Sequence, residues 1–114
     1  MAKVEIVRSL VLEIKKRFSK AEGNKIIDLI QTLEDNPMKG KTLGSVGGIL
    51  IKELKYKKSR FYFLADGFKL RFLSEEELID LLLRFVRMSN KKQQKKTINE
   101  IRQVLIKIGP QGFE

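Results

Sequence analysis

The sequence contains no cysteine and no histidine, and the two absences exclude several kinds of site. Without cysteine the chain has no disulfide scaffold, no thiol nucleophile and no cysteine metal site, which is compatible with the cytoplasm. Without histidine it lacks the commonest general base and the usual zinc ligands. We therefore expect neither a metal nor a cofactor. Any catalysis would depend on Arg, Lys, Tyr, Asp or Glu.

Long apolar runs are also missing. No stretch approaches the roughly 20 apolar residues that span a bilayer, and the N-terminal MAKVEIVRSLVLEIKKRF, with its charged positions, is a poor signal peptide. We expect a cytoplasmic protein without a membrane partner. A chain of 114 residues is long enough for a single domain, 1–114, with one core.

Positive charge is what the sequence has in excess. Lysine and arginine number 24 against 14 acidic residues, which gives a net charge of +10. Such an excess on a small domain favours a polyanionic partner, which could be RNA, DNA or an acidic protein. The alternative explanation is solubility, or the lysine-rich composition of thermophilic proteins.

The first third of the chain predicts a strand and a helical hairpin. Residues 3–9, KVEIVRS, alternate as a short strand does. Apolar residues at helical spacing then predict one helix from Ser9, its expected N-cap, to Phe18. A second follows the interruption at Gly23 and Asn24 and ends before Pro37. The irregular glycines of 38–48 predict a connecting loop and not a P-loop.

The middle of the chain predicts strands around a tight turn. GILIKELKY is the first strand, and RFYFLAD and FKLRFL flank Asp66-Gly67, a two-residue hairpin signal. Side chains alternate between the faces of a strand. The hairpin therefore predicts a core face and a basic outward face, made respectively of Phe61, Phe63, Ala65, Phe68, Leu70, Phe72 and of Arg60, Tyr62, Leu64, Lys69, Arg71, Leu73.

Residues 74–89, SEEELIDLLLRFVRMS, carry two conflicting signals. Ser74 and Glu77 fit a helical capping box, whereas the nearly continuous apolar run LIDLLLRFV fits a strand buried on both faces. The later NKKQQKKTINEIRQVLIKIG predicts a helix that ends at Gly109-Pro110.

Three pieces of the sequence together resemble a known family. They are LEDNPMKGKTL, IKELKYKKSRFYF and LLLRFVRMSNKK. In their order and spacing, over about residues 3 to 107, they are similar to the RelE/ParE/HigB superfamily of toxins from type II toxin–antitoxin modules. The resemblance implies an α+β fold in which an N-terminal strand and a helical hairpin pack on one face of a small antiparallel sheet, with a C-terminal helix. It also implies a strand from about 79 to 88.

For function, the resemblance implies a ribosome-dependent mRNA endoribonuclease, in which the 2′-OH of the mRNA attacks the adjacent phosphate. Arginine suits the stabilisation of the phosphorane because its fork of donors matches phosphate oxygens. Arg60 and Arg87 match the basic positions of the family and are the expected catalytic residues. The expected RNA contacts are Lys55, Lys57, Lys58, Tyr62, Lys69, Arg71, Lys91 and Lys92.

Alternatives remain open at each of these positions. Arg60 and the lysines also fit solvated or ion-paired surface residues, and Tyr62 also fits a cross-strand neighbour of Arg71. The C-terminal IKIGPQGFE has neither the tyrosine nor the histidine of many active members. A ParE-like toxin that targets gyrase, or a non-catalytic nucleic-acid-binding relative, therefore stays possible. Either toxin implies an antitoxin with an acidic or amphipathic helical segment.

Overall fold

The computed structural model describes residues 2–114, apart from the side chains of Glu75, Ile79 and Asp80. It confirms the α+β class. The strands are β1 (Lys3–Ile6), β2 (Lys41–Val46), β3 (Ile49–Tyr56), β4 (Ser59–Asp66) and β5 (Leu82–Asn90). The helices are α1 (Arg8–Arg17), α2 (Lys20–Gln31), α3 (Gly67–Phe72) and α4 (Gln94–Lys107), with 3₁₀ turns at Thr32–Glu34, Glu75–Asp80 and Pro110–Gly112.

The strands form one sheet in the order β1-β5-β4-β3-β2. Neighbours are antiparallel except at one edge, where β1 runs parallel to β5. The prediction of an antiparallel sheet is therefore wrong at that edge. A parallel pair needs a long crossover connection, which the chain between β1 and β5 supplies.

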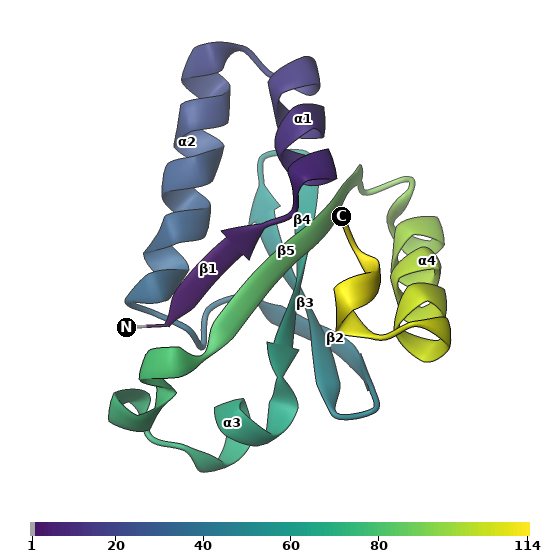
Figure 1. Cartoon of the computed structure of the whole chain (residues 1–114). Helices are drawn as coiled ribbons and strands as arrows, with labels where there is room; N and C mark the ends of the chain where they lie inside the picture. The colour runs from purple at the N-terminus through teal and green to yellow at the C-terminus, as the bar shows by residue number, and fades with distance from the viewer. Residues whose placement is uncertain (1) are drawn as a thin grey trace.

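Helices cover both faces of this sheet. Figure 1 shows the α1–α2 hairpin and α4 on opposite sides of it. Tyr56 of β3 bonds Glu22 of α2 on one face, and Glu53 of β3 bonds Gln94 of α4 on the other. Strand β4 is consequently buried from Arg60 to Ala65. The second face is thus covered by α4, whereas the sequence predicted a basic face that points outward.

The predicted hairpin at Asp66-Gly67 is wrong. Asp66 ends β4, and its carboxylate accepts hydrogen bonds from the amides of Phe68 and Lys69 at 3.0 and 3.1 Å. It is therefore the N-cap of α3, a role that competes with the turn because aspartate favours both. Gly67 fits here because a Cβ would meet the carbonyl oxygen of Gly48 at 2.8 Å.

Because FKLRFL is a helix and not a strand, β4 pairs with β5 instead. The register runs from Ser59 opposite Asn90 to Leu64 opposite Arg84. Of the predicted core face, Phe61, Phe63 and Ala65 are buried, but Phe68 and Phe72 of α3 are 65% and 62% exposed.

The expected loop at 38–48 is also wrong, since it contains β2. The hairpin between β2 and β3 turns at Gly47 and Gly48, whose φ angles of 56° and 83° are left-handed. Such angles favour glycine and are typical of two-residue hairpin turns. Gly47 and Gly48 therefore form a turn between two strands.

The helical hairpin is confirmed, with shifted boundaries. Val7, and not Ser9, is the N-cap of α1. The break between the helices lies at Phe18 and Ser19, and the Ser19 hydroxyl accepts the Glu22 amide at 3.2 Å. Gly23 lies inside α2, where tertiary packing outweighs its poor helix propensity.

Both signals in residues 74–89 were real, each in its own part. Ser74 and Glu77 form the capping box, but it begins a 3₁₀ turn, Glu75–Asp80. The apolar run from Leu82 onward lies in β5, so the strand expected from about 79 to 88 is confirmed with its start moved to Leu82. The final helix is confirmed as α4. None of the helices within residues 2–114 has the length and apolar character to cross a bilayer.

Candidate nucleic-acid interface

Two turns that are distant in sequence bring a group of cations together. The β3–β4 turn carries Lys57 and Lys58, and the β5–α4 turn follows Asn90. They are neighbours because Ser59, which begins β4, pairs with Asn90, which ends β5. Between them lies a hollow of about 390 Å³, which we call the basic hollow, lined by Lys55, Lys57, Lys58, Arg60, Asn90, Lys91 and Lys92.

The basic hollow has no carboxylate among the described residues that line it. Within the described part of the chain, the side chains of Lys55, Lys58, Lys91 and Lys92 have no ion-pair partner. Like charges this close repel one another. An anion with several oxygens, such as a phosphate, relieves that repulsion, so the hollow is suited to a phosphate backbone.

Lys57 has an unusual backbone conformation for a lysine. Its φ of 52° is left-handed, and it is the first residue of the two-residue turn between Tyr56 and Ser59. Glycine takes this conformation freely, whereas a residue with a Cβ loses about 1–2 kcal/mol. A cationic side chain thus occupies the turn at some cost to stability.

Glu22 holds one side of this turn. Its carboxylate accepts hydrogen bonds from the Tyr56 hydroxyl and, at 2.9 Å, from Lys57 Nζ. These bonds lower the pKa of Glu22, with Tyr56 the larger cause. The same carboxylate raises the pKa of Tyr56 and that of Lys57. The ammonium of Lys57 is therefore partly neutralised by Glu22.

Arg60 lies at the base of the basic hollow and is only 8% exposed. Its Nε is 3.3 Å from Glu53 Oε1, and its Nη1 donates to the carbonyl of Lys58 at 3.4 Å. Glu53 also accepts a bond from Gln94 Nε2 at 2.8 Å. Arg60 is thus an ion-paired residue that supports the turn, with one edge at the hollow.

Arg87, the other expected catalytic residue, does not line the basic hollow. Its Nε is 3.1 Å from Glu100 of α4, and its Nη1 donates to the Val86 carbonyl at 2.8 Å. The guanidinium also lies 5.0 Å from the ring centre of Phe113. These contacts join β5 to α4 and the C-terminal segment.

Tyr62 is fully buried. Ser89 donates to the carbonyl of Asn90, so the Tyr62 hydroxyl donates to Ser89 Oγ at 2.8 Å. Burial raises the pKa of Tyr62. A base cannot stack on a ring that is fully buried, so the surface position expected from the hairpin is wrong.

Lys69 and Arg71 lie on α3, at the opposite end of β4 from the basic hollow (Figure 1). Arg71 lies over the exposed ring of Phe72, 5.4 Å from its centre. The structure therefore separates these two residues from the other expected RNA contacts. The cause is the wrong hairpin prediction at Asp66-Gly67, since residues 67–72 form the helix α3 and not a strand paired with β4.

No family model matches the chain. No curated protein and no solved structure matches it either.

Three residues of the site were missed from sequence: Glu53, Gln94 and Asn90. Glu53 gave a weak signal, as an acidic residue between Ile51 and Leu54 in a strand. Gln94 and Asn90 gave none, because only the pairing of β4 with β5 brings them to the turn. Among the side chains that the structure describes, no group of three or more carboxylates is placed to hold a metal ion.

Proposed function

We propose that this chain is a toxin of the RelE type that binds the backbone of mRNA in the basic hollow and cleaves it on the ribosome. The observation that carries the proposal is the convergence of Lys55, Lys58, Lys91 and Lys92 from two turns onto one hollow. The net charge of +10 supports the same class of partner. The sequence resemblance supplies the reaction.

In this mechanism the lysines hold the phosphates on either side of the scissile bond. The 2′-oxygen bonds to the adjacent phosphorus and its proton passes to solvent water, while the bond from phosphorus to the 5′-oxygen breaks and that oxygen takes a proton from a lysine ammonium of the basic hollow. Positive charge around the pentavalent phosphorane lowers the barrier. Arg60 is the arginine among the described residues that line the basic hollow, and its pairing with Glu53 orients it.

The lack of a proton acceptor favours a second candidate. No described residue that lines the basic hollow carries a carboxylate, an imidazole or a phenol. The hydroxyl of Tyr56 is bonded to Glu22, and that of Tyr62 is buried. A ParE-like toxin that blocks gyrase without cutting RNA needs no such group, nor does a non-catalytic nucleic-acid-binding relative.

The proposed partner is an antitoxin with an acidic or amphipathic helical segment that covers the basic hollow. Such a segment would neutralise the unpaired lysines and block the substrate at the same time. The first observation to seek is a small acidic protein encoded beside this gene, and co-purification of the two chains.

The test compares two matched double variants in a reconstituted translation system. Lys91→Ala with Lys92→Ala removes two charges from the basic hollow, and Lys15→Ala with Lys16→Ala removes two exposed charges from α1. We expect the first to abolish mRNA cleavage and the second to retain it, with cleavage mapped by the new 5′ ends.

A gyrase supercoiling assay is run beside it on the same proteins. Supercoiling inhibition without RNA cleavage would establish the second candidate in place of the first. Equal cleavage by both double variants would show that the basic hollow is not the mRNA site.

A further inference from the structure

A second and larger recess lies beside the basic hollow, at the end of β5 between α1 and α4. It measures about 600 Å³, within the usual range for small-molecule sites. We call it the polar cleft. Its wall is formed by Glu13, Arg17, Phe18, Ser59, Met88, Ser89, Asn90, Gln93, Lys96, Thr97 and Glu100.

Both acidic residues that border the polar cleft are ion-paired, Glu13 within the cleft and Glu100 with Arg87, which does not line it. Glu13 pairs with Arg17 at 2.8 Å, and Glu100 pairs with Arg87 at 3.1 Å. Lys96 has no ion pair in the described part of the chain. The cleft is therefore not a second polyanion site, since its acidic groups offset its cations.

Neutral hydrogen-bonding groups make up the middle of the wall. Asn90 Oδ1 accepts the amide of Gln93 at 2.9 Å, which leaves the Asn90 side-chain NH₂ group available. The side chains of Gln93 and Thr97 form no hydrogen bond with any described residue. Phe18 and Met88 add apolar surface. Amide and hydroxyl groups beside an aromatic ring suit a flat polar heterocycle.

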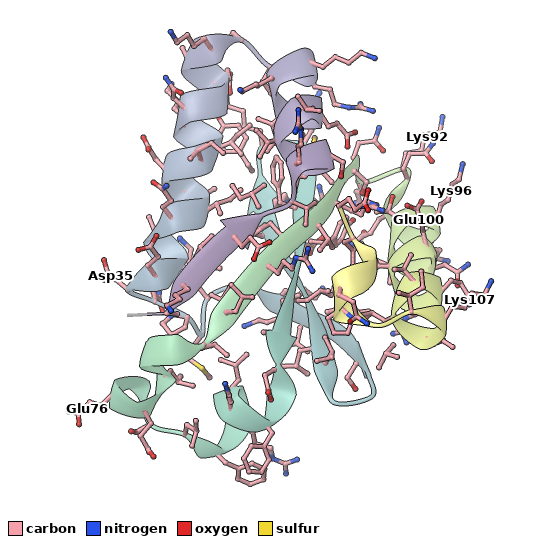
Figure 2. The ribbon with its side chains drawn as sticks, in the orientation of Figure 1. Asp35, Glu76, Lys92, Lys96, Glu100 and Lys107 are labelled. Carbon is pink, nitrogen blue, oxygen red and sulfur yellow. The ribbon has the colours of Figure 1, made fainter. Side chains whose placement is uncertain are left out.

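The two recesses meet at Asn90, which lines both. Figure 2 shows Lys92, Lys96 and Glu100 following one another from the β5–α4 turn down α4. Lys92 belongs to the basic hollow, and Lys96 and Glu100 belong to the polar cleft. A phosphate site thus adjoins a site for a polar ring, which is the arrangement of the parts within a nucleotide.

We propose that the polar cleft takes one base of a single-stranded nucleic acid whose phosphates lie in the basic hollow. The base must be unpaired and turned out of its stack, because a paired base cannot enter a recess. This inference rests on the proposed binding of RNA in the basic hollow, and it adds a selection for single strands and for particular bases.

The test measures fluorescence anisotropy with three probes: a single-stranded RNA decamer, the same backbone with abasic sites, and inorganic polyphosphate as a competitor. We expect the RNA to bind the unmodified chain about tenfold more tightly than the abasic strand, since one stacked and hydrogen-bonded base adds that much. Thr97→Leu fills the cleft and is expected to remove this preference. Polyphosphate binding should not change.

Two further variants guard against a folding artefact. Gln93→Ala acts at the exposed start of α4 and should also reduce the preference. Gln103→Leu, on an exposed position of α4 outside the cleft, should leave it unchanged. Thermal unfolding of each variant verifies that it is folded.

The outcomes separate this inference from the proposed function. If polyphosphate binds but RNA and the abasic strand bind equally well, the base site is refuted and the basic hollow stands. A base preference that survives both Thr97→Leu and Gln93→Ala would also refute the polar cleft. If none of the three probes binds, both proposals fail.

Discussion

The ion pair of Arg60 and Glu53 allows a quantitative prediction. Both side chains are only 10% exposed, and their closest N–O distance is 3.3 Å. In Glu53→Gln the shape is kept, but the guanidinium of Arg60 remains buried without its counter-charge. Breaking one partner of a buried pair costs about 3–5 kcal/mol, a large part of the roughly 5–15 kcal/mol that holds a domain folded.

This free energy converts into a melting temperature. A chain of 114 residues has an unfolding entropy of about 0.24 kcal/mol/K, since each residue contributes roughly 2.1 cal/mol/K. We therefore expect Glu53→Gln to lower the Tm by about 12–20 °C, as measured by circular dichroism. Arg17→Ala is the control. Its side chain is 62% exposed in a pair with Glu13, so the loss should be about 0.5 kcal/mol, or about 2 °C.

A double variant separates stability from chemistry. Arg60→Met with Glu53→Leu removes both charges at once and should restore much of the lost Tm, because apolar replacements of buried pairs are often neutral. If Glu53→Gln lowers the Tm no more than Arg17→Ala does, the buried Arg60 does not depend on Glu53 as its counter-charge, and the predicted loss of stability is refuted. In an assay of the proposed mRNA cleavage, a stable double variant without activity would show that the Arg60–Glu53 pair has a role beyond stability.

Three further predictions concern pH and backbone. The hydrogen bond from Tyr56 lowers the pKa of Glu22. The stabilisation that the Glu22 carboxylate provides is therefore complete above the ordinary carboxyl pKa and is lost as the pH falls through the lowered value. Glu22→Gln should show a smaller loss of Tm on acidification than the unmodified chain. Burial lowers the pKa of Lys52, so the unfolded chain binds the extra proton and stability should rise with pH on the alkaline side. Lys52→Met should remove that rise and increase the Tm near neutral pH, as followed by thermal melts across the pH range. Gly23→Ala should stabilise α2 by about 0.5–1 kcal/mol, because the nearest atom to the new Cβ is 3.8 Å away. Gly48→Ala, at a φ of 83°, should instead destabilise the protein by about 1–2 kcal/mol. Urea denaturation measures both changes.

The parts of the fold that the sequence predicted are those with a local cause. The apolar stripes of α1, α2 and α4 and the capping box at Ser74 are set by residues within a few positions of one another. The failures arose where one local signal has two outcomes. Asp66-Gly67 serves a hairpin or a helix N-cap, and the choice depends on which strand β4 meets across the sheet.

The candidate site followed the same rule. Lys57, Lys58, Lys91 and Lys92 were found because charge can be read directly from the sequence, and they do line one hollow. The burial of Tyr62 could not be predicted, since it depends on parts of the chain that are distant in sequence, among them β5, whose Ser89 bonds the Tyr62 hydroxyl. The polar cleft could not be predicted for the same reason, because it is lined by residues of α1, β5 and α4, which are distant in sequence.

The pairing of β1 with β5 has a consequence for how this chain is made. Lys3 pairs with Leu82, so β1 leaves the ribosome well before the strand with which it pairs. Pairings across so much intervening chain close slowly and late. Until β5 emerges, β1 and one edge of β4 are open backbone that can pair with another nascent chain. During synthesis, β1 and this edge of β4 are therefore accessible to proteases and chaperones until β5 enters the sheet.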